Sequence, residues 1–120
     1  MALTRDFKET VNRRTQNDPK FAAALLDEAI DLFLNGEPEL ARLILRDLVN
    51  ATIGFEKLAD ETSKPSKSLH RMLSANGNPT MDNLNTIFSV LREKLQVNIK
   101  VHVVSKAQGP GLRALFKVPP

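Results

Sequence analysis

The sequence lacks cysteine, tryptophan and tyrosine, and it has only two histidines. Without cysteine there can be no disulfide framework, no thiolate metal site and no thiol nucleophile. Neither His70 nor His102 has a neighbour at the spacing of a metal pair or of a base beside a nucleophile. Glycine-rich phosphate-binding motifs are also missing. These absences argue against an enzyme, and they predict neither a cofactor nor a metal.

Long apolar runs are missing as well. No stretch approaches the ~20 apolar residues of a membrane-spanning helix, and the first residues have no apolar signal-peptide core. Of the 120 residues, 42% are hydrophobic and 26% are charged, which is typical of a globular protein. We therefore expect one cytoplasmic domain, large enough to bury a core and not associated with a membrane.

Acidic residues become scarce in the second part of the chain. Residues 1–50 contain seven Lys and Arg against nine Asp and Glu, whereas residues 51–120 contain ten against five. Between Thr62 and Pro79 there are three cationic side chains, Lys64, Lys67 and Arg71, and no carboxylate. Such a local basic field is expected where a protein approaches phosphate groups, although solvated basic faces are common in proteins of any function.

Helical spacing of apolar residues predicts an all-α domain over residues 1–104. Asp18 followed by Pro19 marks one helix start, Gly36 marks a helix end, and Thr80 is a cap for a later helix. We expect N-terminal helices over 4–53, a helix-turn-helix over 54–75 and a further helix over 80–95. In the helix that begins at Pro38 the residues expected to point outward are Arg42, Arg46 and Asp47.

One strand is predicted after these helices, over residues 97–104. Val97, Ile99, Val101 and Val103 alternate with mostly polar residues. A lone strand is not stable by itself, so we expect it to pair with the same strand of a second copy in a symmetric dimer. The alternative is an extended tail that packs on the helices. Residues 105–120 contain a Gly-Pro-Gly sequence and no acid, and we expect a disordered tail.

The stretch from Gly54 to Asn83 contains the clearest functional signal. Two short helices are predicted there, joined by a tight turn, and the second hides Leu69, Met72 and Leu73 on one face. Its other face consists of hydrogen-bond donors without a single acid, namely Ser66, Lys67, His70, Arg71 and Ser74. This is the arrangement of a helix-turn-helix whose second helix enters the major groove of DNA, where long cationic side chains reach guanine edges and phosphates.

The segments GFEKLA, PSKSLHRML and the Gly77-x-Pro79 loop resemble the helix-turn-helix of Cro and lambda repressor, also called XRE. More closely, TRDFKETV, LLDEAIDLFLNGEPELARLILRDLVNATIGFEKLA and KPSKSLHRMLSANGNPTMDNL resemble the probable addiction-module antidote proteins, which are HigA-like antitoxins. The resemblance covers about residues 3–104. It departs from the repressor pattern in the turn, which is one residue longer, has Ser63 where glycine is frequent and has Pro65 where a hydroxyl cap is frequent.

This resemblance implies a lambda-repressor-like bundle that binds a RelE/ParE-like toxin and represses its own operon by binding double-stranded DNA. The lone strand predicts that it does so as a homodimer. The base-reading positions would be Ser66, Lys67, His70 and Arg71. The phosphate-binding positions would be Gly54, Phe55, Glu56, Lys64, Ser74, Asn76 and Asn78.

Two other functions remain open from the residues. The chain is a protein-interaction module if its acidic helix face, Asp27, Glu28 and Asp31, docks a basic toxin and DNA binding is secondary. It is a stand-alone transcriptional regulator if there is no toxin partner. A neighbouring reading frame that encodes a small basic protein would favour the antitoxin over the regulator.

Overall fold

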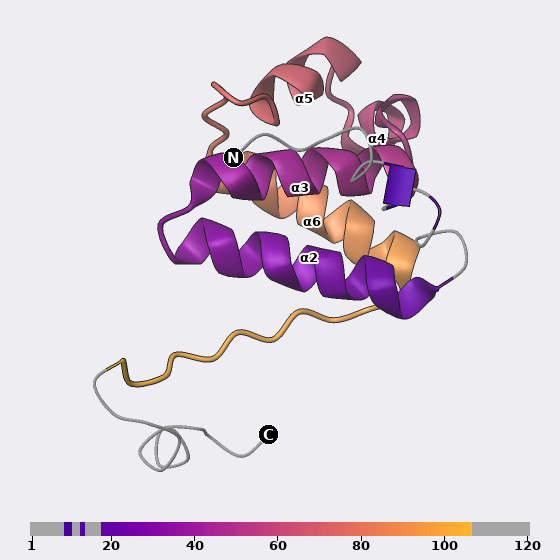
Figure 1. Cartoon of the computed structure of the whole chain (residues 1–120). Coiled ribbons are helices and arrows are strands. Elements are labelled where there is room, and N and C mark those ends of the chain that lie inside the picture. The colour runs from indigo at the N-terminus through magenta and orange to yellow at the C-terminus, as the bar shows by residue number, and fades with distance from the viewer. Residues whose placement is uncertain (1–8, 11–12, 14–17, 107–120) are drawn as a thin grey trace.

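Five helices lie completely within the part of the chain that the structure describes, residues 9–10, 13 and 18–106 of a computed structural model (Figure 1). These described residues form no strand, and the expectation of an all-α fold is confirmed for them. The helices are α2 (Pro19–Leu34), α3 (Pro38–Ala51), α4 (Phe55–Thr62), α5 (Ser66–Met72) and α6 (Met81–Leu95).

The two termini lie mostly outside the described residues. Of the N-terminal helices expected over 4–53, the part before Asp18 is described only at Glu9, Thr10 and Arg13, which are helical. The expected disordered tail over 105–120 falls outside them too, except for Ser105 and Lys106.

The helices begin and end where local chemistry indicates. The Asp18 carboxylate accepts a hydrogen bond from the Lys20 amide at 3.0 Å, and Pro19 occupies the first turn of α2. The Thr80 hydroxyl accepts from the Asn83 amide at 3.1 Å and caps α6. Between α2 and α3 the chain turns at Gly36, whose φ of +87° is a conformation that side-chain-bearing residues rarely adopt. Short polar signals therefore fix the lengths of the helices.

Helices α2 and α3 form a hairpin, and α6 lies alongside it, while the short helices α4 and α5 sit on the far side of α3 (Figure 1). Buried apolar side chains from all five helices meet in a single core. The core residues are Ala22, Leu26, Ala29, Ile30, Ile44, Leu45, Leu48, Val49, Phe55, Leu58, Leu69, Leu73, Leu84, Ile87 and Leu91. The core therefore holds the helix-turn-helix region and the N-terminal hairpin in one unit.

The burial of α3 differs from the sequence expectation at Asp47. We expected this residue to point outward, but its side chain is only 6% exposed. The reason is that other parts of the fold cover most of the circumference of α3. Ala41, Leu45, Leu48 and Val49 are fully buried, and they span more of the helix surface than a single apolar stripe. Arg42 and Arg46, also expected outside, are half-buried.

Residues 97–104, called segment 97–104 below, are extended but do not form a strand within the described chain. The segment follows α6 and runs along α2 in the same direction as that helix (Figure 1). Val97 and Ile99 are half-buried against the core, whereas Val101 and Val103 are 57% and 86% exposed. In the single chain the segment thus has the form of the alternative considered above, an extended stretch packed on the helices.

Candidate nucleic-acid interface

The candidate site begins at Gly54, between α3 and α4. The Gly54 amide donates to the Val49 carbonyl at 2.7 Å, and this bond closes the end of α3. The φ of +81° at Gly54 is a backbone conformation in which any L side chain is strained. The next residue, Phe55, is buried and anchors the first turn of α4, where no side chain caps the helix. The start of α4 is therefore a bend with uncapped backbone amides beside a buried ring.

The turn between α4 and α5 consists of residues 63–65. Ser63 adopts the left-handed conformation at a φ of 57°, and the Lys64 amide donates to the Ala59 carbonyl at 3.2 Å. Pro65 is extended, and its carbonyl accepts the first helical bond of α5 from the Leu69 amide at 3.1 Å. The turn thus ends α4 with a left-handed residue other than glycine and starts α5 without a hydroxyl cap.

Helix α5 has two distinct faces, as its sequence indicates. Leu69 and Leu73 are fully buried in the core, and Met72 is partly buried against it. On the opposite face Lys67, His70 and Arg71 are exposed, and Ser66 is half-buried. Because these four residues lie at i, i+1, i+4 and i+5, they occupy one side of the helix. The predicted apolar face is confirmed, and four of the five residues predicted for the other face lie on it. The fifth, Ser74, lies after the end of α5 and is half-buried.

The imidazole of His70 is not a free side chain. Its ring stacks on Phe55 with the centroids 3.9 Å apart and the planes 20° from parallel. One face of the imidazole is therefore covered by a residue of α4, although the side chain as a whole stays exposed. The stack joins the start of α4 to the middle of α5, and it brings two separate groups of predicted site residues together.

Arg42 of α3 holds the C-terminal end of α5. Its Nε donates to the Ser74 carbonyl at 3.0 Å, and its Nη2 donates to the Ala75 carbonyl at 2.7 Å. Both carbonyls lie just after α5, so the guanidinium ties α3 to the start of the loop that follows this helix. Nothing in the spacing of the sequence points to this contact, which joins residues more than 30 positions apart.

The loop after α5 is tightly turned. The Ser74 hydroxyl donates to the Arg71 carbonyl at 2.8 Å, and the Gly77 amide donates to the Ser74 carbonyl at 3.0 Å. A Cβ at Gly77 would overlap the backbone carbonyl oxygens of Met72 and Arg71, so only glycine fits without a shift of the loop. The two asparagines expected to contact phosphate, Asn76 and Asn78, are exposed on this loop.

The predicted site residues therefore fall into three groups. The exposed face of α5 holds the expected base-reading residues, and Lys64 is half-buried at the preceding turn. The start of α4 adjoins this face through the Phe55–His70 stack. Asn76 and Asn78 follow the far end of α5. Among the predicted phosphate contacts, Glu56 is an exposed carboxylate, so only its backbone amide suits an anion, and the Ser74 hydroxyl already donates within the chain.

No protein-family model matches the chain, and no curated protein or solved structure is similar enough to count as a match. Among the described residues, none of the helices combines the length and apolar character needed to cross a membrane. In the same part of the chain, His, Asp and Glu side chains form no group of three or more that could hold a metal ion.

Proposed function

We propose that the protein is a DNA-binding antitoxin that represses its own operon through α5 and binds a RelE/ParE-like toxin, and that it acts as a homodimer. The observation that carries the DNA-binding part is the exposed face of α5. Lys67, His70 and Arg71 extend from a helix that two fully buried leucines fix in the core. A basic helix face with no carboxylate matches the negative potential of the major groove.

In this proposal, Arg71 and Lys67 donate to base edges and Ser66 allows close approach of the helix to DNA. His70 contributes the ring edge that Phe55 leaves uncovered. The amides at the start of α4, the Lys64 ammonium, and Asn76 and Asn78 bind phosphates on either side of the groove and set the position of α5. In a homodimer, two copies of α5 would read half-sites about 34–36 Å apart, one turn of DNA.

The antitoxin part of the proposal draws on the acidic face of α2. Asp27, Glu28 and Asp31 are all exposed, and toxins of the RelE/ParE type are generally basic. Opposite charge favours encounter and orientation of the two proteins. Charge reversal at these three positions is the test of this surface, with the product of the adjacent reading frame as the ligand. Unchanged affinity in the triple variant would exclude this face as the docking surface.

The first experiment is a titration of the purified protein against its own upstream DNA at fixed, near-physiological salt. Non-specific binding through phosphates alone gives dissociation constants of about 10⁻⁴–10⁻⁶ M. We expect binding well below that range on the upstream DNA, and we expect the Lys67→Ala/Arg71→Ala variant to lose it. For Arg71→Ala alone the expected loss is about 1–3 kcal/mol, concentrated at one base position.

Two controls make this titration decisive. A scrambled duplex reports non-specific binding, and Lys94→Ala removes a cation from α6, outside the helix-turn-helix. Binding that is weak and equal on both duplexes, and insensitive to the double variant, would reject the sequence-reading role of α5. The protein would then act through protein–protein contacts.

A further inference from the structure

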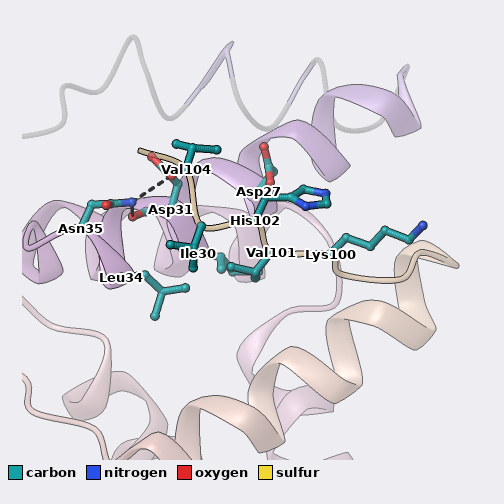
Figure 2. Close-up of a pocket in the computed structure, with 10 residues that line it drawn as sticks. Asp27, Ile30, Asp31, Leu34, Asn35, Lys100, Val101, His102 and Val104 are labelled. Atoms are coloured by element: carbon teal, nitrogen blue, oxygen red, sulfur yellow. Dashed lines mark hydrogen bonds between the residues drawn. The ribbon is translucent and has the colours of Figure 1, made fainter. Parts of the chain in front are cut away.

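The side of the fold away from α5 contains a hollow of about 800 Å³ between α2 and segment 97–104. The α2 side is lined by Asp27, Ile30, Asp31, Leu34 and Asn35 (Figure 2). A second hollow, of about 380 Å³, lies where the segment passes Phe88 and Arg92 of α6. The end of the segment is therefore in loose contact with the helices.

Apolar side chains are left uncovered at this place. Leu34 is 54% exposed, and Val101 and Val103 are more exposed still. Figure 2 shows Val101 beside Ile30, with Leu34 one helical turn further along α2. Val97 and Ile99 contact the core, but the helices leave the apolar residues after Ile99 largely uncovered: Val104 is 40% exposed, Val101 57% and Val103 86%. The apolar layer is incomplete at its outer end.

The backbone of the segment makes a single hydrogen bond within the described part of the chain. After the bond from the Val97 amide to the Arg92 carbonyl, no backbone–backbone hydrogen bond occurs among the described residues from Asn98 to Lys106. An extended chain with free amides and carbonyls is a template for pairing with another strand. The missing element is therefore a strand, and this strand must bring apolar side chains to the helix-facing side.

A second copy of the segment meets both requirements. The pairing of two identical strands about a two-fold axis is antiparallel, and each residue faces its own counterpart or one an even number of positions away. The side-chain faces then match, so valines from both copies lie on the same side.

The register follows from which residues of the segment would face each other across the two-fold axis. Centring the axis on Lys100 would place two ammonium groups directly opposite each other, which is destabilising. Centring it on His102 would oppose Ile99 with Ser105. With the axis on Val101, the two Val101 residues face each other and each Ile99 faces the Val103 of the second copy. This register gives three apolar pairs and sets no ammonium group opposite another. An axis on Ile99 would do the same, but it would leave the exposed Val103 beyond the paired segments.

We propose that segment 97–104 pairs antiparallel with the same segment of a second copy, with Val101 opposite Val101, and that the added strand completes the apolar layer over Leu34. The inference rests on the homodimer of the proposed function but not on DNA binding. It defines the surface through which the two copies associate and the residue on the axis.

The absence of cysteine from the chain allows a direct test by single-cysteine variants of the full chain, without DNA. A disulfide requires Cα atoms no more than about 7 Å apart. Under mild oxidation, Val101→Cys should give a covalent dimer on a non-reducing gel. Val103→Cys and Lys100→Cys should stay predominantly monomeric on the gel, because their counterparts are displaced along the strand.

The mass of the unmodified protein in solution provides the second measurement. Light scattering should give twice the mass of the chain, and Val103→Asp should lose this dimer mass because it places a carboxylate opposite Ile99. A monomeric wild-type protein, or equal cross-linking of all three cysteine variants, would overturn the inference. Neither result depends on the DNA titration, so failure of the dimer surface and failure of DNA reading are distinguishable.

Discussion

Helix α5 and segment 97–104 lie on opposite sides of the layer formed by α2, α3 and α6, and they are held in very different ways (Figure 1). Leu69 of α5 and Leu73 at its C-terminal cap are fully buried, and Arg42 and Phe55 hold the helix from neighbouring helices. The segment has two half-buried apolar residues and one backbone bond at its start.

This difference in packing suits the two regions to different kinds of binding partner. A helix whose position is already fixed loses little conformational entropy when it binds. This favours the recognition of a rigid DNA duplex. A segment with open backbone groups and uncovered valines gains most when a partner strand is added. The same core thus supports α5, which is fully packed in the single chain, and segment 97–104, which is only partly packed.

Truncating one side chain in each region should give the largest difference in the loss of unfolding free energy. Leu69→Ala removes a fully buried side chain of α5, and we expect the free energy of unfolding to fall by about 2–5 kcal/mol. Val103→Ala truncates an 86% exposed side chain, and in the monomer we expect a change within about 0.5 kcal/mol. Urea denaturation monitored by circular dichroism measures both.

Repeating the two measurements over a range of protein concentrations separates the two stability losses further. Because a dimer is stabilised by mass action, the cost of Val103→Ala should rise with concentration, whereas the cost of Leu69→Ala should not depend on it in the same way. Equal costs for the two variants at low concentration would mean that the segment is as firmly packed as α5, and the contrast drawn here would be wrong.

Arg42→Met removes the two hydrogen bonds that Arg42 makes just after α5, and we expect an effect of intermediate size. Two carbonyls lose a charged donor, so we expect a loss of roughly 1.5–3 kcal/mol in unfolding free energy, and weaker operator binding because α5 is less firmly placed. The matched control is Arg46→Met, one turn further along α3, where no hydrogen bond of the side chain occurs within the described residues.

The salt dependence of DNA binding separates bracing from direct contact. A side chain that neutralises one phosphate contributes about 0.9 to the slope of log K against log salt concentration. If Arg42 acts only by holding α5, Arg42→Met should lower affinity and leave this slope unchanged. A slope reduced by about one unit would instead place Arg42 on a phosphate.

Much of this architecture is predictable from the sequence, and the exceptions share one cause. The limits of α2 and α6 follow from Asp18-Pro19 and Thr80, and the two faces of α5 follow from the spacing of Leu69 and Leu73. Periodicity describes one helix at a time, so it does not report what surrounds that helix. It therefore gave the wrong environment for Asp47 and no indication of the bond between Arg42 and the end of α5, because both depend on residues distant in sequence.

The stack of His70 on Phe55 is the third feature of this kind, and it should give the smallest measurable effect. Aromatic pairs contribute about 0.5–1.5 kcal/mol beyond their area, so we expect a coupling of that size in a double-mutant cycle of Phe55→Leu and His70→Gln. Unfolding free energies of the four proteins give the coupling. The same four proteins titrated with DNA show whether the stack serves α5: a coupling in both quantities means that Phe55 positions His70 for binding. A coupling in stability alone means that the imidazole packs against α4 and takes no part in reading DNA.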